Sequence, residues 1–351
     1  MSIQNHAQDA QDCYFMMLAI EQAKQGLYTT RPNPAVGCVI VQSTEVVGQG
    51  FHPKAGEPHA EVFALKEAGM KAVGATAYVT LEPCSHTGRT PPCALGLIDA
   101  GIKRVVIAGL DPNPQVAGRG VVLLEQAGIE VVVGVLTEQA EALNRGFLKA
   151  MRTQMPYVRL KIATSLDGRT AMASGESKWI TSTAAREDVQ KLRAQSGAII
   201  TGSETVIADN PQLNVRSGQL GILPEQVPAP LVVVLDRSQR LAHNLESSHQ
   251  LCRLPSTLYW RTDDLLTLLK TLVSEYQCYD VLVEAGASVA GSFLSQQLVD
   301  ELIVYQAPCL LGAQAKPMVE FNPLSLAEQL RFSVSSHEQV GSDLKLTLLP
   351  L

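Results

Sequence analysis

The spacing of hydrophobic residues predicts a first series of alternating strands and helices. Short apolar runs, typical of buried strands, alternate with segments whose apolar residues recur every three to four positions, as on one face of a helix. This alternation predicts a layered α/β sheet domain. The expected strands are 35–41, 76–81, 104–108 and 130–133, and the expected helices lie near 10–26, 59–70, 93–101, 118–127 and 136–149.

A second series of the same kind begins after Met155-Pro156. A chain of 351 residues suits two domains of roughly 100–200 residues each, so we expect one domain at 1–153 and another at 154–351. The segment 216–230 is rich in Gly and Pro and is expected to be a loop. In this second domain, strands are expected at 157–163, 197–201, 231–235, 280–284 and 301–306, and helices near 182–195, 263–275 and 287–298.

The charge distribution argues against a nucleic-acid-binding protein. The first 150 residues carry 11 basic and 14 acidic side chains and the remainder 17 and 20, so each part contributes −3 to a net charge of −6. Neither part has the basic arm or stripe that binding to a phosphate backbone requires. The N-terminus lacks the positive charge of a signal peptide, and no apolar run reaches the ~18 residues of a membrane span. Seven scattered cysteines do not suggest disulfides, and we expect a cytoplasmic enzyme.

One histidine and two cysteines form a pattern typical of a catalytic zinc site. His59-Ala60-Glu61 is followed by Pro83-Cys84 and, nine residues later, by Cys93. An imidazole and two thiolates leave the fourth position of zinc open for water, which then ionises near neutral pH. Glu61, close to the metal without binding it, is expected to carry protons as general base and then general acid. Both cysteines are expected at helix starts, where amide donors favour thiolates.

These motifs resemble the cytidine-deaminase superfamily and, more closely, the bifunctional deaminase/reductase family of riboflavin biosynthesis. Eight residues separate the two cysteines, whereas typical cytidine and tRNA-adenosine deaminases have P-C-x-x-C. The resemblance covers nearly the whole chain. It implies a cytidine-deaminase-like three-layer sheet domain, followed by a dihydrofolate-reductase-like α/β domain. The motifs that carry it are Asn33-Pro34-Ala35-Val36-Gly37, Gly48-Gln49-Gly50-Phe51-His52, His59-Ala60-Glu61, Glu82-Pro83-Cys84-Ser85-His86-Thr87-Gly88-Arg89-Thr90-Pro91-Pro92-Cys93, Asp111-Pro112-Asn113-Pro114 and Gly118-Arg119-Gly120.

The resemblance also implies the substrate of the first domain. That substrate is a diaminopyrimidinone carrying a ribosylamino 5-phosphate, and deamination yields the corresponding aminouracil. Asn33 and Asp111 each precede a proline, so an ordinary turn role stays open for both. Arg89 is either a phosphate contact or a solvated charge, and the histidines either line the pocket or support it. The residues implied to hold base, ribose and phosphate are Asn33, His52, His86, Arg89, Asp111 and Asn113.

The second domain resembles the reductase half of the same family, with NADPH as its cofactor. No G-x-G-x-x-G fingerprint follows a strand, so a Rossmann dinucleotide site is not supported. Strand-to-helix corners at Gly286 and at Thr201-Gly202-Ser203 can instead bring a pyrophosphate to free amides. The implied reaction is hydride transfer to ribose C1′ in its opened imine form. The substrate residues implied are Lys161, Ser177, Arg193, Leu213, Arg216 and Glu284, with the two arginines as phosphate clamps.

The cofactor residues rest on the same resemblance. Trp179 packs on the nicotinamide or, alternatively, is a core aromatic, and Asp209 is a contact or a turn cap. Ser238 follows strand 231–235 beside Arg237, and this pair is a weak candidate for holding the 2′-phosphate of NADPH. The residues implied to line the cofactor site are Ala163, Trp179, Thr205, Asp209, Ser238, Gly286, Ala287, Ser288, Val289, Ala290, Gly291 and Ser292.

Two rival functions share some of these features. A tRNA-editing base deaminase would use the same zinc site but should show a basic groove, and it would leave the second domain unexplained. A zinc-stabilised binding module would need a fourth protein ligand, for which Cys13, Cys38, His52 and His86 are the candidates. Decay of one domain is a third alternative, although both motif sets are filled. We expect phosphorylated pyrimidines as partners, no nucleic acid or membrane, and a homo-oligomer, either dimer or tetramer.

Overall fold

The computed structural model describes residues 3–85, 91–113, 116–241, 249–251 and 257–351. The chain divides into two compact units, Met1–Thr153 and Gln154–Leu351, which are described separately below. No helix in the described ranges is long and apolar enough to cross a membrane.

The first unit is built on a five-stranded sheet in the order β2-β1-β3-β4-β5. The strands β1 (Gly37–Gln42) and β2 (Glu45–Phe51) form an antiparallel hairpin, and β1 also runs antiparallel to β3 (Thr76–Val79). The strands β3, β4 (Arg104–Ile107) and β5 (Glu130–Val133) are parallel. Because their carboxyl ends share one edge of the sheet, the loops after β3 and β4 lie beside each other.

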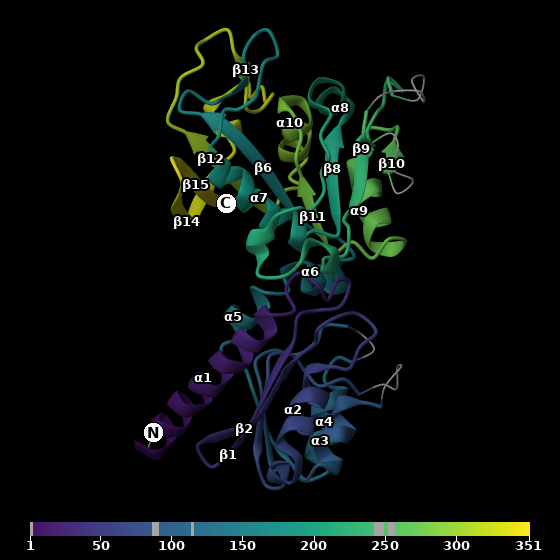
Figure 1. Cartoon of the computed structure of the whole chain (residues 1–351), viewed down its shortest axis with the longest axis vertical. Helices are drawn as coiled ribbons and strands as arrows, with labels where there is room; N and C mark the ends of the chain where they lie inside the picture. Colours follow the sequence, from purple (N-terminus) through teal and green to yellow (C-terminus); the bar gives the residue numbers. More distant parts are fainter. Residues whose placement is uncertain (1–2, 86–90, 114–115, 242–248, 252–256) are drawn as a thin grey trace. The chain divides into compact units, whose positions relative to one another are not determined.

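Helices cover both faces of this sheet and complete three layers (Figure 1). On one face α2 (Ala60–Ala68), α3 (Cys93–Asp99) and α4 (Arg119–Gln126) enclose a core of alanines and branched residues. On the other face α1 (Ile3–Lys24) and α5 (Thr137–Glu141) pack over a second core. The helix α6 (Arg145–Thr153) closes the unit. The closing helix expected at 136–149 is therefore two helices, α5 and α6.

Two glycines bring α2 unusually close to the sheet. On β2, a Cβ on Gly48 would lie 2.1 Å from the carbonyl oxygen of Ala64, and one on Gly50 would lie 2.6 Å from that of Ala60. Real Cβ atoms do not approach backbone atoms so closely, so only glycine fits at these strand positions. Strand β2 was not predicted, because two glycines interrupt its hydrophobic pattern.

The second unit contains an eight-stranded sheet in the order β10-β9-β8-β11-β6-β12-β15-β14. Six neighbouring strands run parallel, and β15 and β14 are antiparallel additions at one edge. A separate two-stranded sheet pairs β7 (Arg169–Ala171) with β13 (Lys316–Pro317). The bounds of the main strands are β6 Tyr157–Ser165, β8 Ala198–Gly202, β9 Leu231–Leu235, β10 Thr257–Trp260, β11 Asp280–Val283, β12 Glu301–Ala307, β14 Phe332–Val340 and β15 Asp343–Pro350.

Helices pack on both faces of the parallel part of this sheet. On one face lie α9 (Leu265–Ser274) and α10 (Ala287–Ser295), around the buried Phe293. On the other face lie α7 (Thr183–Gln195) and α8 (Ser203–Asp209), around the buried Tyr305. The strands β10, β14 and β15 and the helix α8 were not predicted. Among the expected site residues, Ala163 lies near the carboxyl end of β6 and Glu284 directly follows β11.

Candidate active sites

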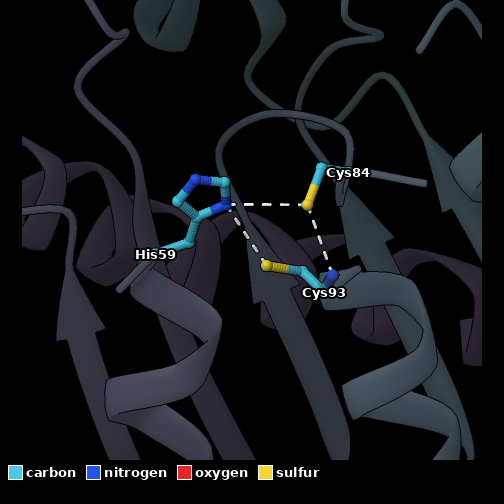
Figure 2. Close-up of side chains that lie close together, drawn as sticks. All are labelled: His59, Cys84 and Cys93. Atoms are coloured by element: carbon cyan, nitrogen blue, oxygen red, sulfur yellow. Dashed lines mark hydrogen bonds between the residues drawn. The ribbon is translucent and has the colours of Figure 1, made fainter. Parts of the chain in front are cut away.

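His59, Cys84 and Cys93 come together at the carboxyl edge of the first sheet (Figure 2). His59 is the N-cap residue of α2 and Cys93 is the first residue of α3, so two helix starts face each other across the loop after β3. The Nδ1 atom of His59 lies 3.6 Å from Cys84 Sγ and 3.3 Å from Cys93 Sγ. Cys84 itself lies in an extended loop rather than at a helix start, so that part of the expectation is wrong; its sulfur instead accepts the Cys93 N–H at 3.3 Å.

The spacing of these three atoms fits a zinc ion. With Zn–S bonds of about 2.3 Å and Zn–N bonds of about 2.0–2.1 Å at tetrahedral angles, nitrogen and sulfur ligands stand about 3.5 Å apart. The two measured separations straddle this value. Among the described residues the cluster provides three ligand atoms and no fourth. Three protein ligands with one open position are typical of a catalytic zinc site rather than a structural one.

The two thiols of the cluster shift each other's pKa in opposite directions. The hydrogen bond from Cys93 lowers the pKa of Cys84 to about 4, with a further contribution from His59. The same contact with Cys84, together with burial, raises the pKa of Cys93. The contact with Cys84 also raises the pKa of His59. A thiolate is therefore favoured at Cys84, and thiolates are the form in which cysteine binds zinc.

Glu61 lies in the first turn of α2 with its side chain buried. Its Oε2 atom has no hydrogen-bond partner among the described residues. Burial raises the pKa of Glu61 above its ordinary value, and the neighbouring His59 acts in the opposite direction. A buried carboxylate oxygen without a partner costs free energy, so its presence beside the three ligands indicates a function rather than a structural role.

His52 supports its neighbours through both ring nitrogens. Its side chain is 3% exposed; Nδ1 lies 3.1 Å from the carbonyl oxygen of Pro58, and Nε2 lies 3.0 Å from the amide nitrogen of Asn33. Because a carbonyl only accepts, Nδ1 carries the proton and Nε2 accepts from Asn33. Burial lowers the pKa of His52, which agrees with a neutral ring. The side-chain amide group of Asn33 is thereby held in place.

The remaining expected residues of the first unit lie partly outside the described ranges. Asp111 is buried, and its carboxylate accepts the backbone N–H of Asn113 at 2.8 Å. His86 and Arg89 fall in the segment 86–90, outside the described residues. Glu82, which was quoted in the family motif but given no role, is a buried carboxylate two residues before Cys84 that accepts three backbone N–H groups. The sequence signal that could have indicated a role for Glu82 is the presence of an acidic residue in an otherwise apolar stretch.

In the second unit, a buried ion pair joins α7 to the end of β11. Arg193 donates to both carboxylate oxygens of Glu284, at 2.6 and 2.9 Å, and also reaches the carbonyl oxygen of Asn214. Burial alone would raise the pKa of Glu284, but Arg193 outweighs it and the net shift is downward. Lys161 lies on the adjacent strand β6, since Leu160 pairs with Val283, and burial lowers its pKa. Arg216 reaches the side chain of Asn214 at 2.9 Å, so the four expected polar residues form one cluster.

Other expected residues of the second unit are more scattered. The Ser177 hydroxyl donates to Asp209 at 3.1 Å, which joins an expected substrate residue to an expected cofactor residue. Leu213 is buried in the core next to α7. Trp179 is 69% exposed with the Arg186 guanidinium over its ring, so the core alternative for Trp179 is wrong. Ser238 lies exposed in the turn after β9.

The corner formed by β8 and α10 fits a dinucleotide phosphate. Thr201 is fully buried at the end of β8, and its hydroxyl has no partner among the described residues. The next residue, Gly202, lies against Val289 in the first turns of α10, and Gly286 is the N-cap of that helix with open space around it. Exposed helix amides and a hydroxyl suit a phosphate oxygen. Ala163 and Thr205 border this edge of the sheet, whereas Ala290 and Gly291 pack inward and Ser292 bonds to the carbonyl oxygen of Ser288.

Comparisons with known proteins agree with both sites. The family described as the cytidine and deoxycytidylate deaminase zinc-binding region matches residues 9–109, and the family described as the RibD C-terminal domain matches residues 156–346. Riboflavin biosynthesis protein RibD of Haemophilus influenzae is 49% identical over 97% of this chain and 98% of its own length. The chain belongs to the RibD family.

Further relatives of the RibD family extend this match to the fold. The Escherichia coli RibD protein is 49% identical over 97% of this chain and 99% of its own length. The solved structure of Acinetobacter baumannii RibD, form 2, is 53% identical, with a TM-score of 0.92 over 98% of this chain and 100% of that one. A Thermotoga maritima deaminase/reductase structure is 33% identical, with a TM-score of 0.86 over 98% and 100%.

Membership of the RibD family settles the general activity. The chain is a bifunctional enzyme of riboflavin biosynthesis, with hydrolytic deaminase and NADP-dependent reductase activities, and its cofactors are Zn²⁺ and NADPH. The expected fold class is confirmed: a cytidine-deaminase-like unit precedes a dihydrofolate-reductase-like unit. The rival functions, a tRNA-editing deaminase and a non-enzymatic zinc module, are thereby excluded.

Proposed function

We propose that the first unit hydrolyses 2,5-diamino-6-(5-phosphoribosylamino)pyrimidin-4-one and that the second unit reduces the resulting 5-amino-6-(5-phosphoribosylamino)uracil. The observation that carries this proposal is the cluster of His59, Cys84 and Cys93 beside the unpartnered carboxylate oxygen of Glu61. The Thermotoga maritima relative is named for these two substrates.

In the first unit, we assign proton transfer to Glu61. Zinc held by His59, Cys84 and Cys93 supplies the Lewis acidity that activates water near neutral pH. Water oxygen bonds to ring carbon C2, the C2–NH₂ bond breaks, and ammonia leaves. Glu61 Oε2, free of other partners, accepts the water proton and returns it to the departing nitrogen. The carbonyl of the uracil ring is the product.

Substrate binding in the first unit falls to residues around this cluster. Asn33, held by His52, offers its carboxamide oxygen to an N–H group of the pyrimidine. His52 itself acts through Asn33 rather than by direct contact, since both of its ring nitrogens are used. Asp111 and Asn113 border the same edge of the sheet after β4. We assign His86 and Arg89 to ribose and phosphate, on the family motif alone.

In the second unit, the cluster at the end of β11 binds the ribosyl phosphate. NADPH supplies the hydride that ribose C1′ accepts in its open imine form, and the imine nitrogen takes a proton. Arg193 and Arg216 provide guanidinium groups for the phosphate. Lys161 and Glu284, on neighbouring strands, flank the ribose and can hydrogen-bond its hydroxyls. Leu213 and Ser177 complete the proposed substrate site.

The cofactor lies, in this proposal, along the carboxyl edge from β6 to β8. The start of α10, from Gly286 to Ser288, and the hydroxyl of Thr201 receive the pyrophosphate. Trp179 is exposed, and the Arg186 guanidinium lies over its ring. We assign Trp179 to cover the nicotinamide. Ser238 is assigned to the 2′-phosphate. The other proposed cofactor residues are Ala163, Thr205, Asp209, Val289, Ala290, Gly291 and Ser292.

Stepwise turnover tests the proposed function. The phosphorylated diaminopyrimidinone is supplied without NADPH, and ammonia release is measured; NADPH is then added, and its absorbance at the nicotinamide band is followed. We expect one ammonia per substrate in the first stage and one NADPH oxidised per ammonia in the second. Ammonia release without later NADPH oxidation would overturn the proposed reduction of the aminouracil, and ammonia release only after NADPH is added would overturn the order of the two reactions. No ammonia in either stage would overturn the substrate.

We further propose a cytoplasmic homo-oligomer, a dimer or tetramer. The edge strand β14 is exposed at seven of its nine positions, and exposed sheet edges invite pairing with another chain. Light scattering on the eluting protein should give two or four times the chain mass of 37.7 kDa. A single-chain mass would overturn this assembly.

A further inference from the structure

The buried carboxylate of Glu82 hydrogen-bonds to both ends of the loop that follows β4. Its Oε2 atom accepts the backbone N–H of Asp111 at 3.2 Å and that of Gly118 at 2.9 Å. Its Oε1 atom accepts the N–H of Gly120 at 2.8 Å. Asp111 begins the loop, and the two glycines end it at the start of α4. Both ends of the loop are therefore held by one side chain, which is 4% exposed.

The backbone around Glu82 is closely packed. A Cβ on Gly120 would lie 2.1 Å from the carbonyl oxygen of Pro83, so the start of α4 packs directly against the residue between Glu82 and Cys84. The Glu82 N–H also donates to the carbonyl oxygen of Gly109. Three backbone N–H donors compensate the burial of the Glu82 side chain.

We infer that Glu82 is a positioning residue for deamination, which sets where Asp111 and Gly118 stand relative to the zinc ligands. This inference rests on the proposed function, in which Asp111 and Asn113 contact the pyrimidine substrate. Glu82 is two residues from Cys84 along the chain and spans to residues 29, 36 and 38 positions further on. Glu82 therefore connects the turn that carries Cys84 to the segment that carries Asp111 and Asn113, and it is proposed to bind neither metal nor substrate itself.

The decisive variant is Glu82→Gln. Glutamine keeps the size of the side chain but has one acceptor oxygen, so in either orientation its NH₂ group faces an N–H donor that the carboxylate had accepted. We expect the KM of deamination to rise about tenfold or more, with kcat changed less than about threefold, as for the loss of a charge-assisted hydrogen bond. Zinc content should stay at one per chain, and NADPH oxidation on the aminouracil should be unchanged in the same preparation.

Glu67→Gln serves as the matched control. The Glu67 carboxylate also accepts a backbone N–H, from Gln49 at 2.9 Å, but it is exposed on α2 and is not connected to the loop. We expect this variant to behave as the unaltered enzyme in both reactions.

Amide hydrogen exchange gives a readout that does not depend on turnover. In Glu82→Gln, protection of the peptide containing Gly118 and Gly120 should fall, whereas the peptide containing Gln49 should be unchanged. An unaltered KM would overturn the inference, as would a loss of zinc in parallel with kcat, which would mean that Glu82 acts on Cys84. If the unaltered enzyme releases no ammonia from the substrate, the proposed function fails, while the exchange experiment still tests whether Glu82 holds the backbone at Gly118 and Gly120.

Discussion

The two units place their reactive groups in contrasting ways. In the first unit, Glu61 keeps a buried oxygen without a partner among the described residues, next to three atoms that could bind a metal ion. In the second unit, Arg193 and Glu284 satisfy each other in a two-pronged ion pair. The contrast is therefore between a buried carboxylate oxygen that has no partner among the described residues and two opposite charges that are paired with each other.

Removal of the metal is the strongest test of this contrast. Cys84→Ser replaces a thiolate by a hydroxyl group, which does not hold zinc at neutral pH. We expect zinc content to fall to near zero and deamination to fall below detection, with NADPH oxidation on the aminouracil preserved. Metal analysis and the two activity assays provide the measurements. Cys13→Ser, at an exposed thiol on α1, is the control. Full zinc content in Cys84→Ser would remove Cys84 from the ligand set.

Glu61→Gln separates metal binding from proton transfer. The amide keeps the shape of the side chain but cannot accept a proton, so we expect the kcat of deamination to fall about 10²–10⁴-fold, the usual range for a general acid–base group. Zinc should remain bound, because Glu61 is not a ligand. A variant that deaminates at the original rate would exclude the assigned role of Glu61.

Arg193→Ala tests the ion pair of the second unit. The change leaves the Glu284 carboxylate buried without its partner, which destabilises a fold by about 3–5 kcal/mol. We expect a lower unfolding midpoint for the second unit and a higher KM for the aminouracil, with deamination intact. Thermal unfolding and both assays measure this.

A compensating change sharpens the same experiment. Glu284→Gln in the Arg193→Ala background removes the unpaired charge, so part of the lost stability should return while reduction stays impaired. Arg237→Ala, which breaks an exposed pair with Asp263, should change stability little. A deamination defect in Arg193→Ala would contradict separate sites.

The smallest expected effect concerns a purely structural pair in the first unit. Burial would raise the pKa of Asp12, but hydrogen bonds from Arg104 and Tyr78 outweigh it and the pKa lies below its ordinary value of 3.8. A carboxyl with a lowered pKa in the fold adds stability above the ordinary pKa and loses it as the pH falls. Asp12→Asn should therefore cost about 1.5–3 kcal/mol at pH 7 and progressively less below pH 4. Urea unfolding at several pH values measures this loss of stability. A loss in the free energy of unfolding that did not change with pH would contradict the expectation.

The zinc site could be predicted from sequence because its ligands are local. His59 and Cys93 lie at helix starts, and Cys84 lies in the short loop after β3, so a spacing pattern along the chain reports directly on the cluster. The reductive cluster draws Lys161, Arg193 and Glu284 from three separate elements, β6, α7 and the end of β11, and no local pattern brings them together. Only the resemblance to the RibD family predicted that cluster.

The hairpin of β14 and β15 was missed for a different reason. The strand β14 is exposed on both faces, so polar residues fill it and its hydrophobic pattern is weak. The alternation of Leu344, Leu346 and Leu348 in β15 was the signal that could have revealed the pair. The role of Glu82 was not predicted, because a spacing pattern cannot show which backbone amides a carboxylate will contact.

The glycines of β2 have a consequence for how hydrolysis can be damaged or tuned at a distance. Gly48 and Gly50 let α2 rest on the strand backbone, and the first turn of that helix carries Glu61 just after His59. A methyl group at either glycine would lift the helix, shifting the imidazole and the carboxylate as one rigid piece while both sulfurs stayed in place. Strand β2 thus sets the distance between α2 and the sheet. Substitutions at Gly48 or Gly50 can therefore abolish deamination without placing a side chain in the active site.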